Sequence, residues 1–265
     1  MQKKLLVAVL GTLFAMPVLA ADAPAAAPAP AVTSNVSIVS NYLYRGISQT
    51  GAKPAIQGGF DYAHASGFYA GAWGSSISWL TDSPTVTGAT SAQLELDTYF
   101  GFKNAFATDF NYDVGFLRYN YPGSYTATLP AGAAKADTNE IYGLIGWKWL
   151  TAKYSYSLGD TFGISNAKGT SYFDLSASYP IADTGVTLGA HYGKQTYKGS
   201  TTDALVAAAS TPTYSDYKLS VSKDFSGFAL GLAYSNTNAN KTQYTSGTNK
   251  FLGDGAAVLS VTRTF

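Results

Sequence analysis

Short segments in which apolar and polar residues alternate limit the fold of this chain more than any other feature. The clearest segment spans residues 93–102, in which Leu94, Leu96, Thr98, Phe100 and Phe102 alternate with Gln93, Glu95, Asp97, Tyr99 and Gly101. A period of two places successive side chains on opposite faces of a β-strand. Such strands recur from about residue 35 to residue 265. They predict an all-β fold, a closed antiparallel transmembrane β-barrel with a polar interior.

The alternation predicts about twelve strands, and bacterial single-chain barrels have even strand numbers. The expected spans are 35–46, 54–63, 68–78, 92–102, 110–120, 138–147, 150–158, 170–179, 185–193, 213–223, 228–235 and 256–265. Each is close to the roughly 9–11 residues that a tilted strand needs to cross a bilayer. The connections are alternately short and long, as in outer-membrane barrels with short periplasmic turns and longer extracellular loops. Both termini are therefore expected on the periplasmic side.

Two of these strands have an ambiguous inward face. In 68–78 both faces carry apolar or small residues, so the pattern does not assign Trp73 to either side. In 110–120 the outward phase leads to Arg118. Either this side chain reaches the membrane interface, or a bulge switches the face at that point.

Composition agrees with a barrel and argues against several classes of function. Only 12% of the residues are charged, and the chain has 20 Tyr, 27 Gly and no Cys. Without Cys there is neither a disulfide framework nor a cysteine metal site. A formal net charge of +1 gives no argument for a nucleic-acid partner. Because no phosphate-binding, zinc or calcium motif is found, we expect no cofactor and no metal.

The first residues have the features of a secretory signal peptide. Lys3 and Lys4 precede an apolar stretch that ends in Val18-Leu19-Ala20, a small-residue cleavage pattern. A membrane-anchor helix is the alternative, but the stretch is short for one. We expect a signal peptide at 1–20, a disordered Ala/Pro-rich segment at 21–34 and the barrel at 35–265. Cleavage near Ala20 ahead of a barrel predicts the outer membrane of a Gram-negative-type cell.

The last predicted strand ends in Phe265, in phase with Val261 and Leu259. A terminal aromatic residue that closes the last strand is similar to the signal that the barrel-insertion machinery recognises. That machinery and the lipid of the outer membrane are thus expected partners. Other aromatic residues near predicted strand ends are expected in interfacial girdles. They are Tyr42, Tyr44, Tyr62, Trp79, Tyr119, Tyr121, Trp147, Trp149, Tyr179 and Tyr192.

Charged and polar residues on the inward phase are the candidate pore lining. They are Arg45, Asp61, Glu95, Asp97, Asp113, Glu140, Lys148, Lys153, Asp174, His191, Asp216 and Lys218. Acids outnumber bases, which favours a water-filled pore with a mild cation preference. The alternative is that these charges pair across neighbouring strands and partly fill the lumen. Arg45 is either a positive site at the pore mouth or the partner of Asp61 in a salt bridge.

An enzyme is not expected, and no catalytic residues are assigned. The chain has two His, and only His191 falls on an inward phase. A hydrolase would pair it with an inward serine such as Ser176 or Ser178, oriented by a third polar group. Serine is abundant, so this coincidence carries little weight. Glu95 and Asp97 are two residues apart on one face, but any polar-in strand produces such pairs.

A run near the start of the predicted barrel resembles a known family. It comprises Ser40-Asn41-Tyr42, Tyr44-Arg45-Gly46-Ile47-Ser48-Gln49-Thr50, Lys53 to Tyr62, Gly67 to Gly71 and Trp73-Gly74. Further along, Glu95-x-Asp97-x-Tyr99-x-Gly101, Tyr112 to Gly115, Asp216 to Lys218 and Lys223 to Phe225 look like the same family. Together they resemble the TorF family of porin-like proteobacterial outer-membrane proteins. The resemblance implies an outer-membrane channel and no particular substrate.

The sequence thus favours a porin-like channel for passive diffusion of small hydrophilic solutes or ions. About twelve strands make a lumen narrower than that of general porins with 16–18 strands. The alternative is a non-conducting barrel that acts as an adhesin or receptor through its long loops. Paired charges and bulky inward residues along the whole lumen would favour the alternative.

Overall fold

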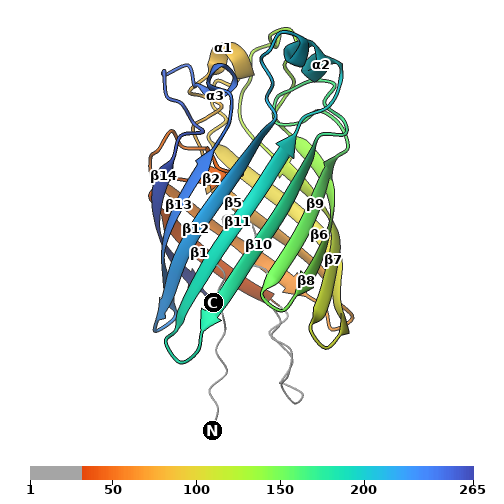
Figure 1. Cartoon of the computed structure of the whole chain (residues 1–265). Coiled ribbons are helices and arrows are strands. Elements are labelled where there is room, and N and C mark those ends of the chain that lie inside the picture. Colours follow the sequence, from red (N-terminus) through yellow and green to blue (C-terminus); the bar gives the residue numbers. More distant parts are fainter. Residues whose placement is uncertain (1–31) are drawn as a thin grey trace.

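Twelve antiparallel strands form a closed barrel in the computed structural model, which describes residues 32–265 (Figure 1). Each strand pairs with its neighbours in the barrel order, and β1 closes the barrel against β14. The strands are β1 (Val32–Val39), β4 (Ala55–Ala63), β5 (Phe68–Ser76), β6 (Leu94–Ala107), β7 (Phe110–Asn120), β8 (Thr138–Trp147), β9 (Leu150–Ser157), β10 (Ser171–Ile181), β11 (Val186–Thr196), β12 (Tyr214–Phe225), β13 (Phe228–Thr237) and β14 (Ala256–Thr264). The predicted fold class is confirmed. The predicted signal peptide lies outside the described residues.

Short turns and long loops alternate around the barrel, as the sequence predicts. The turns 64–67, 108–109, 148–149, 182–185 and 226–227 lie at one end, which we call the turn end. The longer connections lie at the opposite end, the loop end. Three of them carry short helices at the top of Figure 1, α1 (Pro84–Thr87), α2 (Ser200–Ala207) and α3 (Lys241–Tyr244). No helix within residues 32–265 has the length and hydropathy to cross a membrane.

The two faces of the barrel wall differ as the alternation predicts. On β6, Leu96 and Phe100 are exposed on the outer face, whereas Glu95, Asp97 and Tyr99 are buried inside. Leu219 and Leu259 are among the most exposed apolar residues of the outer face. An apolar outer band is what a bilayer requires of a spanning barrel.

The structure resolves both ambiguous strands. Trp73 points inward, because its ring packs edge-on against the buried ring of Tyr42 at 5.7 Å between centroids. In β7 the pairing runs without a break through Arg118, which remains on the outer phase near the loop end. Its guanidinium donates to Asn120 and Asn139 and lies 3.5 Å from Asp137. The irregularity in this pair of strands lies instead between Ala105 and Ala107.

The prediction that the aromatic residues near strand ends form interfacial girdles is wrong for half of these residues. Tyr42, Tyr44, Tyr119 and Tyr121 are buried inside the barrel, and Trp79 packs with them. The outer members are Tyr62, Trp147, Trp149, Tyr179 and Tyr192. Proximity to a strand end does not by itself distinguish an interfacial ring from an inward ring at the lumen mouth.

The first strand starts at Val32, before the expected residue 35, and ends at Val39 rather than at residue 46. Residues 40–54 leave the wall and fold into the lumen; we call them the inner segment. It contains a small hairpin of β2 (Leu43–Tyr44) and β3 (Ile47–Ser48). Nearly all its residues between positions 41 and 50 are buried. The prediction of a continuous strand over 35–46 was therefore wrong, because the chain leaves the wall after Val39 and folds back at Arg45 and Gly46.

A tight turn at Arg45 and Gly46 makes this hairpin possible. Both residues have positive φ, 48° and 77°, as a type I′ hairpin turn requires. Glycine adopts this conformation freely, whereas a residue with a Cβ loses roughly 1 kcal/mol. Arg45, in the first turn position, therefore adopts a backbone conformation that is unfavourable for a residue with a Cβ. Its side-chain contacts, described below, offset that cost.

Replacing Gly46 with alanine is expected to displace the hairpin. A Cβ at this position would lie 2.5 Å from Cγ2 of Thr237 and 2.7 Å from Cβ of Asp216. Together with the positive φ, this clash is expected to lower the free energy of unfolding by about 1–3 kcal/mol. Urea unfolding of the refolded protein in lipid would measure it. Gly143→Ala is the matched control, because a Cβ there meets nothing within 4 Å. Equal effects of the two substitutions would contradict the position of the hairpin.

Candidate functional site: the barrel lumen

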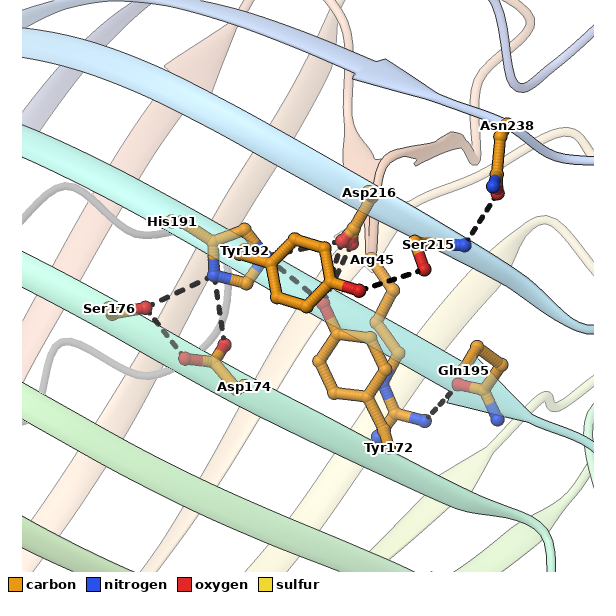
Figure 2. A network of polar contacts seen from close by, with 10 residues as sticks. All are labelled: Arg45, Tyr172, Asp174, Ser176, His191, Tyr192, Gln195, Ser215, Asp216 and Asn238. Carbon is orange, nitrogen blue, oxygen red and sulfur yellow. Dashed lines mark hydrogen bonds and ion pairs between the residues drawn. The ribbon is translucent and has the colours of Figure 1, made fainter.

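Arg45 lies at the tip of the inner segment and connects it to the barrel wall. Its Nη2 lies 2.8 Å from Oε2 of Glu140 on β8, and its Nη1 donates to Oε1 of Gln195 on β11 at 2.7 Å. The guanidinium carbon also lies 4.3 Å from the ring centroid of Tyr172 on β10. Figure 2 shows Arg45 between Gln195 and Tyr172. The expected salt bridge to Asp61 was wrong, because the hairpin carries Arg45 away from β4.

The ion pair of Arg45 and Glu140 is removed from water, since their side chains are 5% and 1% exposed. Burial by itself lowers the pKa of Arg45, but the charge of Glu140, followed by Tyr44 and Tyr119, raises it well above its ordinary value. The guanidinium therefore stays charged. Charge-assisted hydrogen bonds of this kind are among the stronger ones in proteins.

Two tyrosines of the inner segment bind the neighbouring strands β6 and β7. Tyr42 donates to Oε1 of Glu95 on β6 at 2.6 Å, and Tyr44 donates to the hydroxyl of Tyr119 on β7 at 2.7 Å. Burial, and then the charge of Glu95, raise the pKa of Tyr42 well above its ordinary value, so its phenol keeps its proton. The inner segment is thus fastened to β6, β7, β8 and β11. It crosses the lumen instead of lining one wall.

A second network lies on β10, β11 and β12 (Figure 2). Nδ1 of His191 lies 3.2 Å from Asp174 and 3.1 Å from Oγ of Ser176. Its Nε2 lies 3.2 Å from Asp216, which also accepts from Tyr172 at 2.8 Å. These residues meet as the predicted inward phase requires, because His191 faces Ser176 across one strand pair.

This arrangement does not favour a serine nucleophile. A general base needs a free ring nitrogen that accepts the serine proton. In His191 each ring nitrogen lies against a carboxylate, and Ser176 donates to Asp174 at 2.6 Å. The imidazole is therefore arranged to donate from both nitrogens. Ser178, the other serine considered, has no hydrogen-bond partner for its hydroxyl.

The turn-end half of the lumen has separate contacts. Tyr99 donates to Asp61 at 2.5 Å, and Tyr69 donates to Asp113 at 2.6 Å while its hydroxyl also meets that of Tyr142. Lys153 lies over the ring of Tyr142, with Nζ 4.0 Å from its centroid. Polar and charged side chains therefore face one another along this half of the wall.

Two predictions about the lumen lining need correction or addition. Lys148 does not face inward, because it lies in a turn with φ 52° and pairs with Asp109 at 3.5 Å. The alternating phase was applied there beyond the end of β8. Lys103 was missed, because β6 extends past the predicted end at residue 102. Its Nζ lies 5.2 Å from the ring centroid of Tyr69. Lys218, as predicted, is on the inward phase of β12, paired in register with His191.

Several buried polar atoms of the lumen have no hydrogen-bond partner in the structure. They are Oδ1 and Oδ2 of Asp97, Oδ2 of Asp113, Oε1 of Glu140, Nε2 of Gln195, Oγ of Ser178 and Nε1 of Trp79. Within residues 32–265, no group of three or more His, Asp or Glu side chains is arranged to hold a metal ion. The lumen thus contains charged and aromatic groups, together with several buried donors and acceptors that have no hydrogen-bond partner.

The chain belongs to a protein family described as "Bacterial protein of unknown function (Gcw_chp)", whose model matches residues 22–265. The resemblance to the TorF family is not part of this finding and remains a prediction. A comparison with curated proteins found no significant match.

Solved structures of outer-membrane porins are similar to the barrel at low sequence identity. The NanC porin has a TM-score of 0.50 and 9% identity, with 89% of this chain and 99% of that chain covered. The KdgM porin has a TM-score of 0.48 and 8% identity, covering 88% and 97%. OccAB3 of Acinetobacter baumannii has a TM-score of 0.44 and 13% identity, covering 90% and 65%. At such identities the likeness to NanC bears on the fold alone, which is that of a porin-like barrel.

Proposed function

We propose that this member of the Gcw_chp family is an outer-membrane channel for passive diffusion of small hydrophilic solutes or ions, narrowed by its inner segment. The observation that carries the proposal is a twelve-stranded barrel with a polar, charged inner wall. An inner wall of this kind, inside an apolar outer band, suits an aqueous passage across a membrane. Because the inner segment occupies part of the lumen, the proposed path past it is narrow, which favours small solutes over a wide sieve.

The charge of the lumen supports a preference for cations. The inward acids are Asp61, Glu95, Asp97, Asp113, Glu140, Asp174 and Asp216. Arg45, Lys103, Lys153 and Lys218 are the inward bases, together with His191. Acidic side chains on a pore wall attract cations and repel anions. The excess of acids is small, so we propose a mild preference.

The zero-current potential of the refolded protein in a KCl gradient tests the proposed selectivity. A potential shifted toward the equilibrium potential of K⁺ is expected. Asp113→Asn removes one inward carboxylate and is expected to move the potential toward zero by several millivolts. Asp109→Asn is the matched control, because Asp109 lies in a turn outside the lumen. An anion-shifted potential, or identical behaviour of the two variants, would contradict a cation preference set by lumen acids.

A non-conducting barrel is the second candidate, and one observation favours it. The loop-end half of the lumen is filled by bulky buried side chains that include Tyr42, Leu43, Tyr44, Leu117 and Tyr119. If the inner segment closes the path completely, the long loops become the functional surface, as in an adhesin or receptor. A conductance measurement on the protein with its inner segment unaltered separates the two candidates. Current supports the channel, and no current supports the non-conducting barrel.

The proposal includes the route to the membrane. Residues 1–20 are proposed to be a cleaved signal peptide, with both termini periplasmic and the long loops outside the cell. The strand that ends near Phe265 is proposed to contact the barrel-insertion machinery. Deletion of Phe265 is expected to reduce the amount of assembled barrel in the outer membrane several-fold, measured by heat-modifiable migration in gels. Unchanged assembly would contradict that role.

A further inference from the structure

The charged residues on the outer face of the barrel wall are all cations. Within residues 32–265, the wall strands carry Arg118, Lys194, Lys223 and Arg263 on the outer phase, each close to a strand end. The acidic residues of these strands all lie on the inward phase. Phe173 and Phe228, the register partners of Lys194 and Arg263, are exposed on the same outer face. The wall strands therefore present only positive charge at the borders of the apolar band, where lipid headgroups lie against a spanning barrel.

Arg118 lies where the apolar band ends at the loop end. Two residues closer to the turn end, Phe116 is in register with Phe100 and Ile141, which are both exposed on the outer face. Arg118 itself is in register with Asn139 on β8, and the connection 121–137 begins soon after it. A long cationic side chain at such a border reaches the headgroups rather than the acyl chains.

The guanidinium of Arg118 is held by its neighbours and keeps donors for a further acceptor. Its Nε donates to Oδ1 of Asn120 at 2.6 Å, and its Nη1 donates to Oδ1 of Asn139 at 3.1 Å. Its Nη2 lies 3.5 Å from Oδ2 of Asp137, which is longer than a usual charge-assisted hydrogen bond. The side chain is 42% exposed. A positioned guanidinium with accessible N–H groups thus faces the surroundings of the barrel.

A second cation shares the same carboxylate. Nζ of Lys135 lies 2.9 Å from Oδ2 of Asp137, and the lysine side chain is 47% exposed. Oδ1 of Asp137 accepts from the backbone N–H of Tyr121 at 2.8 Å. One carboxylate therefore serves two cations and a backbone N–H. The cluster of Arg118, Lys135 and Asp137 keeps an excess of positive charge.

We propose that Arg118 and Lys135 bind the phosphate of a membrane lipid headgroup in the leaflet at the loop end. A planar guanidinium matches the oxygens of a phosphate in a bidentate way, and the ammonium group adds a point charge. A lipid is favoured over a dissolved anion, because Arg118 borders the exposed apolar side chains of the wall. The acyl chains of the same lipid would contact Phe100 and Ile141.

This site goes beyond the proposed channel, because it lies on the outer face of the wall and takes no part in conduction. A conducting barrel and a closed barrel would bind the lipid equally. Lipid binding therefore tests the site separately from any current measurement.

The test is native mass spectrometry of the refolded full chain, released from micelles of a neutral detergent that contain increasing amounts of phosphatidic acid. The wild type is expected to bind phosphatidic acid saturably. The double variant Arg118→Gln, Lys135→Gln is expected to bind it roughly tenfold more weakly, because each cation near an anionic headgroup adds attraction. Lys241→Gln with Lys250→Gln is the matched control. It removes the same charge from the connection between β13 and β14, which are not neighbours of β7, and is expected to bind like the wild type.

Lys135→Gln alone keeps the proposal testable if the double variant does not fold, and is expected to weaken binding several-fold. Equal affinity of the wild type and the folded variants would overturn the site. An equal loss in the control variant would overturn it too, because net charge alone would then explain the binding. Inorganic phosphate, added at the same concentration as the lipid, is expected to leave the lipid bound. Displacement of the lipid by inorganic phosphate would overturn a lipid as the occupant.

Discussion

Arg45→Ala is expected to lower the free energy of unfolding by about 3–5 kcal/mol, the usual effect of breaking a buried ion pair. The substitution leaves the carboxylate of Glu140 buried without its cation, and it removes the contact of the guanidinium with the ring of Tyr172. The arginine also holds the tip of the inner segment through Gln195. Urea unfolding in lipid, followed by tryptophan fluorescence, would measure the loss.

A double-mutant cycle with Glu140→Gln separates the ion pair from the other contacts of Arg45. Glutamine keeps the shape of the side chain and removes the negative charge. If the pair holds the inner segment, the double variant is expected to lose less stability than the two single variants added together. Strict additivity would mean that the two charges do not interact in the folded protein.

Replacing the inner segment by a short turn is expected to raise single-channel conductance roughly threefold or more, because the free cross-section of the lumen increases when the segment is removed. The design is favourable, because Val39 and Ala55 are register partners on adjacent strands. A two-residue Asn-Gly turn in place of positions 41–53 can therefore join β1 to β4 as an ordinary hairpin.

A deletion of similar length in an outer loop provides the control for this experiment. Residues 200–208, which include α2, can be shortened without touching the inner segment. That variant is expected to keep a conductance close to that of the wild type. Equal conductance of the wild type and the variant without the inner segment would show that the segment does not narrow the path.

The barrel itself could be predicted from the sequence, because a period of two is local information. The spans of β7 and β8 agree with the predicted 110–120 and 138–147. Most of the lumen residues were predicted to point inward by the same phase, and Asp174, His191 and Asp216 meet on three adjacent strands as that phase requires. Strand phase therefore predicts neighbours on adjacent strands.

Contacts across the lumen could not be predicted in this way. Arg45 and Glu140 are 95 residues apart in sequence, and their contact depends on a hairpin that leaves the wall. The alternating phase gives no sign of this departure, because Tyr42, Tyr44 and Gly46 continue a plausible strand pattern. The turn at Arg45 and Gly46, where both residues have positive φ, is visible only in the structure. The alternating phase also misplaces residues where a strand end is predicted wrongly. Lys148 was predicted to face inward although it lies in a turn, and Lys103 was missed although it lies on β6.

Single-channel recording of the refolded wild-type barrel in planar bilayers tests the central claim most directly, that this is a conducting barrel narrowed by its inner segment. Small, discrete current steps are expected, well below those of a barrel of 16–18 strands in the same salt. Silence from protein that is demonstrably folded and inserted would contradict the claim, and the function would then lie in the long loops.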